Sequence, residues 1–96
     1  MAHAAIVLAS SDNVGVVTAD VRPGSDLLVA DRKLEVRDPI PFGHKIALTA
    51  IAPGVDIVKF GVPIGRAKAA IAPGEHVHVH NIESTYINNA IDNYEA

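Results

Sequence analysis

The sequence predicts an all-β domain of short strands joined by tight turns. Short runs of β-branched and aliphatic residues alternate with glycine and proline along most of the chain. No stretch before residue 82 has the sustained apolar period of an amphipathic helix. The 96 residues are 49% hydrophobic but only 4% aromatic, so a core of Ile, Val, Leu and Ala side chains is expected.

A degenerate repeat organises the chain. Four segments share the pattern apolar-x-x-Gly-x-x-apolar, at residues 21–27, 40–46, 51–57 and 71–77. Three of them contain Pro-Gly, in which proline presets φ at one turn position and glycine supplies a positive φ at the next, as a type II turn requires. Each segment is therefore predicted to end one strand, turn tightly and begin another.

Strands are predicted between these turns. In chain order, they cover residues 6–8, 16–18, 27–29, 34–36, 46–48, 57–60 and 64–70. Residues 31–33 are predicted to turn a hairpin, and residues 61–63 are predicted to form another turn. These elements form one domain, residues 1–84. In residues 85–96 Ile87, Ile91 and Tyr94 have helical spacing, which leaves a short helix, a frayed tail and a docking arm open.

Composition excludes several classes of function. The net charge is −3 and no run of Lys or Arg occurs, which argues against binding to nucleic acid or a membrane surface. The chain has no cysteine, so it offers neither disulfides nor thiol chemistry. The first apolar run, residues 4–9, is too short for a signal peptide or a membrane span. A cytoplasmic location is expected.

The segment Gly-Glu-His-Val-His-Val-His-Asn at residues 74–81 carries three of the five histidines. In an extended strand, His76, His78 and His80 would share one face, and Val77 and Val79 would lie on the other. Such rings can bind a metal, relay protons or hold a carboxylate near neutral pH. The solvated face of an edge strand would show the same alternation.

The spacing of these histidines limits how they could hold an ion. His76 and His78 are neighbours on the expected face, so the pair could share one ion. The outer two rings would lie about 13 Å apart along a straight strand, too far to bind the same ion.

The chain resembles the altronate/galactarate dehydratase family over roughly residues 5–84. The matching pieces are residues 12–14, 43–48, 59–61, 63–67 and 74–81. This resemblance, to the small subunit or N-terminal domain of the family, implies an SAF domain with the β-clip fold. It also implies a partner, the large catalytic subunit. That subunit would supply most of the ligands of a divalent metal (iron, manganese or magnesium) and the base. The present chain would then be inactive alone.

The family also suggests the reaction. Its dehydratases remove water from a sugar acid such as altronate or galactarate and leave a 2-keto-3-deoxy acid. A related enzyme, sulfolactate sulfo-lyase, releases sulfite from sulfolactate. Residues 12–17 of this chain resemble the small subunit of that enzyme more closely, because many dehydratases have Ala where Gly15 stands here. A stand-alone module that binds small acids, and an assembly domain that forms a homo-oligomer when isolated, remain alternatives.

Candidate site residues follow from this chemistry. The candidate acids are His44, His76, His78 and His80. His78 is ranked first, because it has neighbours on the same face on both sides. His76 and His78 are also candidate metal ligands. Candidate contacts to the hydroxy-acid substrate are Lys45, Lys59, Arg66, Asn81 and Asn13. Lys59 and Arg66 could instead pair with Asp56, and Asp12 is expected to hydrogen-bond to nearby backbone in a turn.

Overall fold

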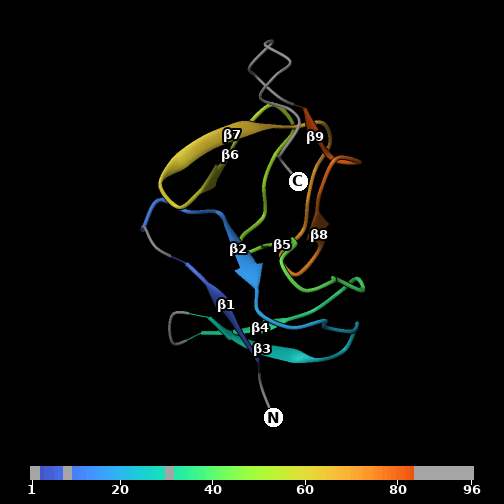
Figure 1. The fold of residues 1–96 in the computed structure, drawn as a ribbon. Helices are drawn as coiled ribbons and strands as arrows, with labels where there is room; N and C mark the ends of the chain where they lie inside the picture. Colours follow the sequence, from blue (N-terminus) through green and yellow to red (C-terminus); the bar gives the residue numbers. More distant parts are fainter. Residues whose placement is uncertain (1–2, 8–9, 30–31, 84–96) are drawn as a thin grey trace.

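The computed structural model describes residues 3–7, 10–29 and 32–83, and this part of the chain is all-β, as predicted (Figure 1). Its strands are β1 (His3–Ile6), β2 (Val14–Val17), β3 (Asp26–Val29), β4 (Arg32–Glu35), β5 (Lys45–Ala47), β6 (Asp56–Lys59), β7 (Val62–Ala67), β8 (His76–Val77) and β9 (Ile82–Glu83). Within these ranges no helix is long and apolar enough to cross a membrane. The predicted tail, residues 85–96, lies outside the described residues.

The strands form two sheets. One has six strands in the order β4-β3-β1-β2-β5-β8, and the other has three in the order β6-β7-β9. Strands β1 and β3 run parallel, and the other pairs are antiparallel. Figure 1 shows the three-stranded sheet at one end of the described chain and β3 and β4 at the other, with β2, β5 and β8 between them.

The four repeats form four turns with the same hydrogen bonds, which we call the clip turns. In the first, the N–H of Ser25 donates to the carbonyl of Arg22 over 3.1 Å and closes the turn. The N–H of Gly24 then donates to the carbonyl of Val36, whose own N–H donates back to Ser25, both over 2.8 Å. The turns at Gly43, Gly54 and Gly74 form the same pair of hydrogen bonds with Val17, Ala67 and Ala47, respectively.

The glycine of every clip turn has the positive φ that the repeat predicts. The values are +89° for Gly24, +84° for Gly43, +82° for Gly54 and +89° for Gly74. The first apolar residues of the repeats also pair with one another, Val21 with Ile40 and Ile51 with Ile71. The repeats are therefore joined two by two, the first with the second and the third with the fourth.

Two aliphatic clusters form the core, roughly one for each pair of repeats. One contains Val17, Val21, Leu27, Val29, Val36, Ile40, Ile46 and Leu48. The other contains Val14, Ala47, Ile51, Ile57, Ala67, Ile71 and Val77. Consecutive residues of β5 enter different clusters, because Ile46 and Ala47 point to opposite faces of their strand. Strand β5 therefore has core on both faces, and the histidine site described below lies beside it and its neighbour β8.

One predicted turn lies elsewhere. The turn expected at residues 61–63 lies at Phe60 and Gly61, and Val62 already belongs to β7. Both turn residues have positive φ, +54° and +78°, as a two-residue hairpin turn of type I′ requires. This turn leaves Pro63 inside β7. The hairpin predicted at residues 31–33 is also shifted, because β4 begins at Arg32.

Substitution of the clip glycines provides a stability test. Gly54→Ala places a Cβ in open space, so only the positive φ opposes it, and a loss of about 1 kcal/mol is expected. Gly74→Ala has the same φ penalty, and its Cβ also overlaps the backbone carbonyl of Glu35, which raises the expected loss to about 2–4 kcal/mol. Urea unfolding of both variants measures the difference. Equal midpoints would show that Gly74 is not packed against β4.

Candidate functional site

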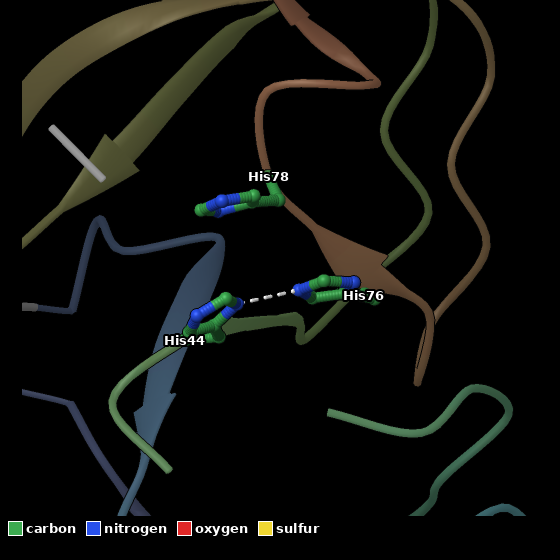
Figure 2. A group of neighbouring side chains, drawn as sticks. All are labelled: His44, His76 and His78. Carbon is green, nitrogen blue, oxygen red and sulfur yellow. Dashed lines mark hydrogen bonds between the residues drawn. The ribbon is translucent and has the colours of Figure 1, made fainter. Parts of the chain in front are cut away.

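Four of the five histidines gather beside β5 and β8. Nδ1 of His44 and Nε2 of His76 are 2.9 Å apart and share a hydrogen bond (Figure 2). The ring of His78 stacks on that of His44, with centroids 4.4 Å apart, and on that of His76, with centroids 5.4 Å apart. The ring of His80 lies against His76, at a centroid distance of 5.3 Å. We call His44, His76, His78 and His80 the histidine cluster.

The sheet and the clip turns bring these residues together from distant parts of the chain. His44 directly follows Gly43, and its carbonyl accepts the N–H of Val17 in the clip. His76 lies in β8 opposite Ile46 of β5, and its N–H donates to Oδ2 of Asp38 over 2.9 Å. Pairing of β5 with β8 therefore brings together two rings separated by 32 positions in the sequence.

The expectation of one continuous strand through His76, His78 and His80 is wrong beyond Val77. Strand β8 ends there, and residues 78–81 turn the chain toward β9, which pairs with β7 in the other sheet. A straight strand could not join both sheets, because β8 and β9 have different partners. The estimate of about 13 Å between the outer rings does not apply for this reason.

Asn81 shapes this turn. Its Oδ1 accepts the N–H of His78 and its Nδ2 donates to the carbonyl of His76, both over 2.9 Å. The carbonyl of His78 in turn accepts the N–H groups of Asn81 and Ile82, each over 3.0 Å. The face opposite the histidines, on which Val77 and Val79 were expected, was predicted to pack into the core, but Val79 is 65% exposed. The predicted contrast between a histidine face and a valine core face therefore fails at Val79, although Val77 is buried as expected.

Burial and mutual repulsion keep the central rings neutral. Burial lowers the pKa of His76 to about 4, with further lowering by His44, His80 and His78 and a small opposing effect of Asp38. Burial also lowers the pKa of His78, followed by the charges of His44, Lys45 and His80. At neutral pH both rings are therefore neutral, so each has one nitrogen lone pair that can accept a proton or bind a metal.

The cluster has the donor set of a transition-metal site. One ligand nitrogen from each of His44, His76 and His78 lies within 4.8 Å of the other two. Nδ1 of His78 is buried and has no hydrogen-bond partner among the described residues. Neutral imidazole nitrogens suit zinc, iron, copper and nickel, so these three residues fit such an ion. His44, which the sequence suggested only as an acid, thus joins the predicted ligands His76 and His78.

Lys45 is the candidate cation that acts on this cluster. It lies in β5, only 4% exposed, opposite Val16 of β2 and Val77 of β8. Its charge contributes to the lowered pKa of His78, which indicates that the ammonium group lies near that ring. A buried cation beside neutral imidazoles is suited to hold a carboxylate.

Lys59 and Arg66 lie in the other sheet, on the β6–β7 hairpin. Nζ of Lys59 is 5.6 Å from the centroid of the Phe60 ring. Arg66 is exposed, and its Cα lies opposite those of Asp56 and Glu83. Their strands belong to the three-stranded sheet, whereas His76 lies in β8 of the six-stranded sheet.

Asn13 and Asp12 fasten the same hairpin. Oδ1 of Asn13 accepts the N–H of Val58 over 2.7 Å, and its Nδ2 donates to the carbonyl of Asp56 over 2.8 Å. Oδ1 of Asp12 accepts the N–H of Gly61 over 2.7 Å. Asp12 was expected to bond nearby backbone and Asn13 to contact the substrate, but the backbone partners of both side chains lie more than 40 residues away in sequence.

Sequence reasoning missed Asp38. Its carboxylate fixes the backbone of His76 and is the negative group that opposes the lowering of that pKa. The one sequence signal was its place in Asp-Pro, a pair typical of turns. The contact spans 38 positions, which no local pattern reveals.

The fold and the cluster define a small all-β domain in which half-buried imidazoles lie near a buried lysine. Comparison with known proteins identifies its family. Residues 3–85 match the altronate/galactarate dehydratase SAF domain, so the chain belongs to that family. It is 47% identical over 70 residues to altronate dehydratase of Escherichia coli, covering 73% of this chain and 14% of that protein.

Two further relatives differ in how much of them is matched. Altronate dehydratase of Bacillus subtilis is 43% identical over 79 residues, which is 82% of this chain and 16% of that protein. The (2R)-sulfolactate sulfo-lyase subunit alpha of Chromohalobacter salexigens is 40% identical over 86 residues, covering 82% of this chain and 92% of that subunit. The chain thus spans a small part of the dehydratases and nearly all of the sulfo-lyase subunit.

The low pKa of His76 predicts a pH dependence of stability. The unfolded ring takes up a proton near its ordinary pKa of 6.5 and the folded ring only near 4, so the folded state loses stability as the pH falls between these values. The His76→Gln variant lacks this contribution. Urea unfolding at about pH 7.5 and about pH 4.5 should show a smaller loss for the variant than for the unchanged chain. An equal loss would mean that His76 takes up its proton normally in the folded state.

Proposed function

We propose that this chain is the SAF subunit of a hydroxy-acid lyase and completes an active site on a larger catalytic subunit. The favoured reaction is dehydration of a sugar acid of the altronate or galactarate type to a 2-keto-3-deoxy acid. The observation that carries the proposal is the histidine cluster beside Lys45, in a family whose relatives include altronate dehydratases. His44, His76 and His78 are half-buried, so part of each residue remains exposed and could be covered by a partner and a substrate.

The reaction removes a proton from the carbon next to a carboxylate and expels a group from the following carbon. That proton is weakly acidic, because the electrons it leaves behind enter a group that is already negative. A cation at the carboxylate spreads this charge and lowers the barrier. Lys45 is the cation that this chain offers beside the cluster, and a divalent metal, where bound, would polarise the same carboxylate.

The neutral rings limit the roles that they can take. With a pKa of about 4, roughly one His76 ring in a thousand is protonated at neutral pH. An imidazolium at this position is therefore a poor source of the proton that hydroxide needs when it leaves. We assign to His76 and His78 the binding of substrate or metal by their lone pairs, and to groups of the large subunit the base and the donated proton.

A second reaction has specific support. The match to the sulfo-lyase subunit alpha extends over 92% of that subunit, whereas 14% and 16% of the two dehydratases are matched. Release of sulfite from sulfolactate needs the same stabilised carboxylate but no proton donor for the leaving group, because sulfite departs as a stable anion. Neutral rings suit that elimination as well.

Co-expression separates these possibilities. The chain is produced with a large catalytic subunit of the same family, and the purified complex is given aldonates, aldarates and sulfolactate in turn. Keto-acid formation from a sugar acid supports the dehydratase, and sulfite release supports the alternative. The isolated chain is expected to be inactive in both assays. Turnover by the isolated chain, or no turnover of any of these acids by a stable complex, would contradict the proposal.

Substitution of His78 tests the role of the cluster in that complex. His78→Ala removes a ring that is proposed to bind substrate or metal and that stacks on both His44 and His76, so kcat/KM should fall about 100-fold. Lys33→Ala is the control, because Lys33 is exposed on β4 at the opposite edge of the six-stranded sheet. Its kcat/KM should stay within about twofold of that of the unchanged complex. Full activity of the His78 variant would place the cluster outside the active site.

A further inference from the structure

We propose that His44, His76 and His78 together bind one divalent transition-metal ion and leave its remaining positions open to a ligand from outside the chain. This deepens the proposed function, on which its biological meaning rests, by assigning metal ligands to this chain rather than to the large subunit alone. The inference itself stands on geometry that is present in the chain without any partner.

The three nitrogens lie close enough together to surround an ion once the stacked rings rotate, because the lone pair of each nitrogen lies in the plane of its ring. They lie within 4.8 Å of one another, and those of the hydrogen-bonded pair His44 and His76 are 2.9 Å apart. Zinc–nitrogen bonds of about 2.1 Å in a tetrahedral site place ligand nitrogens about 3.4 Å apart. The close pair must therefore open by about half an ångström and the widest pair must close by at most about 1.4 Å. Rotation of the side chains supplies such shifts, because the terminal torsion of histidine is soft.

The number of protons on the rings is also compatible with binding of a metal ion. In the hydrogen bond between His44 and His76 one nitrogen carries the proton and the other accepts it. An ion between the two rings takes the place of this proton, which moves to the other nitrogen of its own ring. Both rings stay neutral, so binding of the ion releases no proton at a pH where the rings are already neutral. Nδ1 of His78, buried without a partner among the described residues, gains a partner if it binds the ion.

The backbone of each ligand is held in place. The carbonyl of His44 accepts a hydrogen bond in its clip, the N–H of His76 donates to Asp38, and the N–H of His78 donates to Asn81. Ordering of the ligands is therefore largely complete before an ion arrives, which favours binding by lowering its entropic cost. Histidines that are close only by chance on a flexible surface lack such fixed backbones.

The ligand set selects the class of ion. Three imidazole nitrogens suit zinc, iron, cobalt or nickel, whereas magnesium prefers oxygen ligands. Three protein ligands with an open position are also typical of catalytic rather than structural zinc sites. Of the iron, manganese and magnesium suggested by the family resemblance, iron fits these three residues best, and magnesium would need oxygen ligands from elsewhere.

Metal titration of the full chain tests the inference without any lyase assay. Chelator-treated protein is titrated with Co²⁺, followed by visible absorption, and with Zn²⁺ by calorimetry. One ion per chain is expected, with Mg²⁺ unable to compete. In NMR spectra the Co²⁺-shifted imidazole signals should belong to His44, His76 and His78, which identifies the ligands without any substitution.

Alanine variants provide the matched comparison. Loss of a ligand in His44→Ala or His78→Ala should weaken binding by at least about 100-fold, since loss of a group that merely supports a ligand costs 10- to 100-fold. His80→Ala removes a ring that contacts His76 but lies outside the three, so binding should weaken by no more than about 10-fold. Lys33→Ala, at an exposed position of β4 on the opposite edge of the six-stranded sheet, is the neutral control and should leave binding within about twofold. Amide NMR spectra check that each variant is folded.

Three results would overturn the inference: Co²⁺ and Zn²⁺ binding weaker than about 1 mM, shifted signals from other residues, or equal losses for His80→Ala and His78→Ala. Each is independent of the proposed function, because a chain that binds Co²⁺ through these rings could still form an inactive complex. An active complex whose small subunit binds no ion would, conversely, contradict only the metal site.

Discussion

The mutual hydrogen bonding between each clip turn and one buried residue from another part of the chain is the constraint on which the rest of the structure depends. The described strands are only two to six residues long, so ladders alone leave many backbone groups without partners. At each clip the glycine N–H and the next carbonyl satisfy both groups of Val36, Val17, Ala67 or Ala47. Every such bond contributes about 0.5–1.5 kcal/mol, and its loss would leave a buried polar group unpaired, which costs more.

The histidine cluster is a consequence of these clips. Two of them, at Gly43 and Gly74, flank the paired strands β5 and β8, and the residues just after each glycine include His44 and His76. The half-buried rings of His44, His76 and His78 are thereby crowded together, with the exposed His80 beside them. Burial and mutual repulsion there favour the neutral forms of His76 and His78. The arrangement that holds the fold together thus also produces a group of lone pairs beside a buried lysine.

The repeat and the strands could be predicted from the sequence, because Pro-Gly turns and β-branched runs are local signals. The fold class and the positive φ of Gly54 and Gly74 followed from them. The family followed instead from the resemblance of several short segments, such as residues 43–48 and 74–81, to its members. The path of the chain after Val77 could not be predicted, because the alternation of His and Val also fits a continued strand. The chain turns there so that β9 can pair with β7 in the other sheet. Contacts across 32 to 49 positions, such as His44 with His76 and Asp12 with Gly61, leave no local trace either.

The central claim is that the clips hold His44, His76 and His78 together in the chain by itself, with the rings of His76 and His78 neutral at physiological pH. Imidazole NMR of the isolated, metal-free chain tests it most directly, through nuclear Overhauser effects between rings and the titration of each ring. The account predicts effects between His44 and His78, whose centroids are 4.4 Å apart, and a His76 pKa near 4. Rings without mutual effects, with His76 titrating at its ordinary pKa of 6.5, would contradict it.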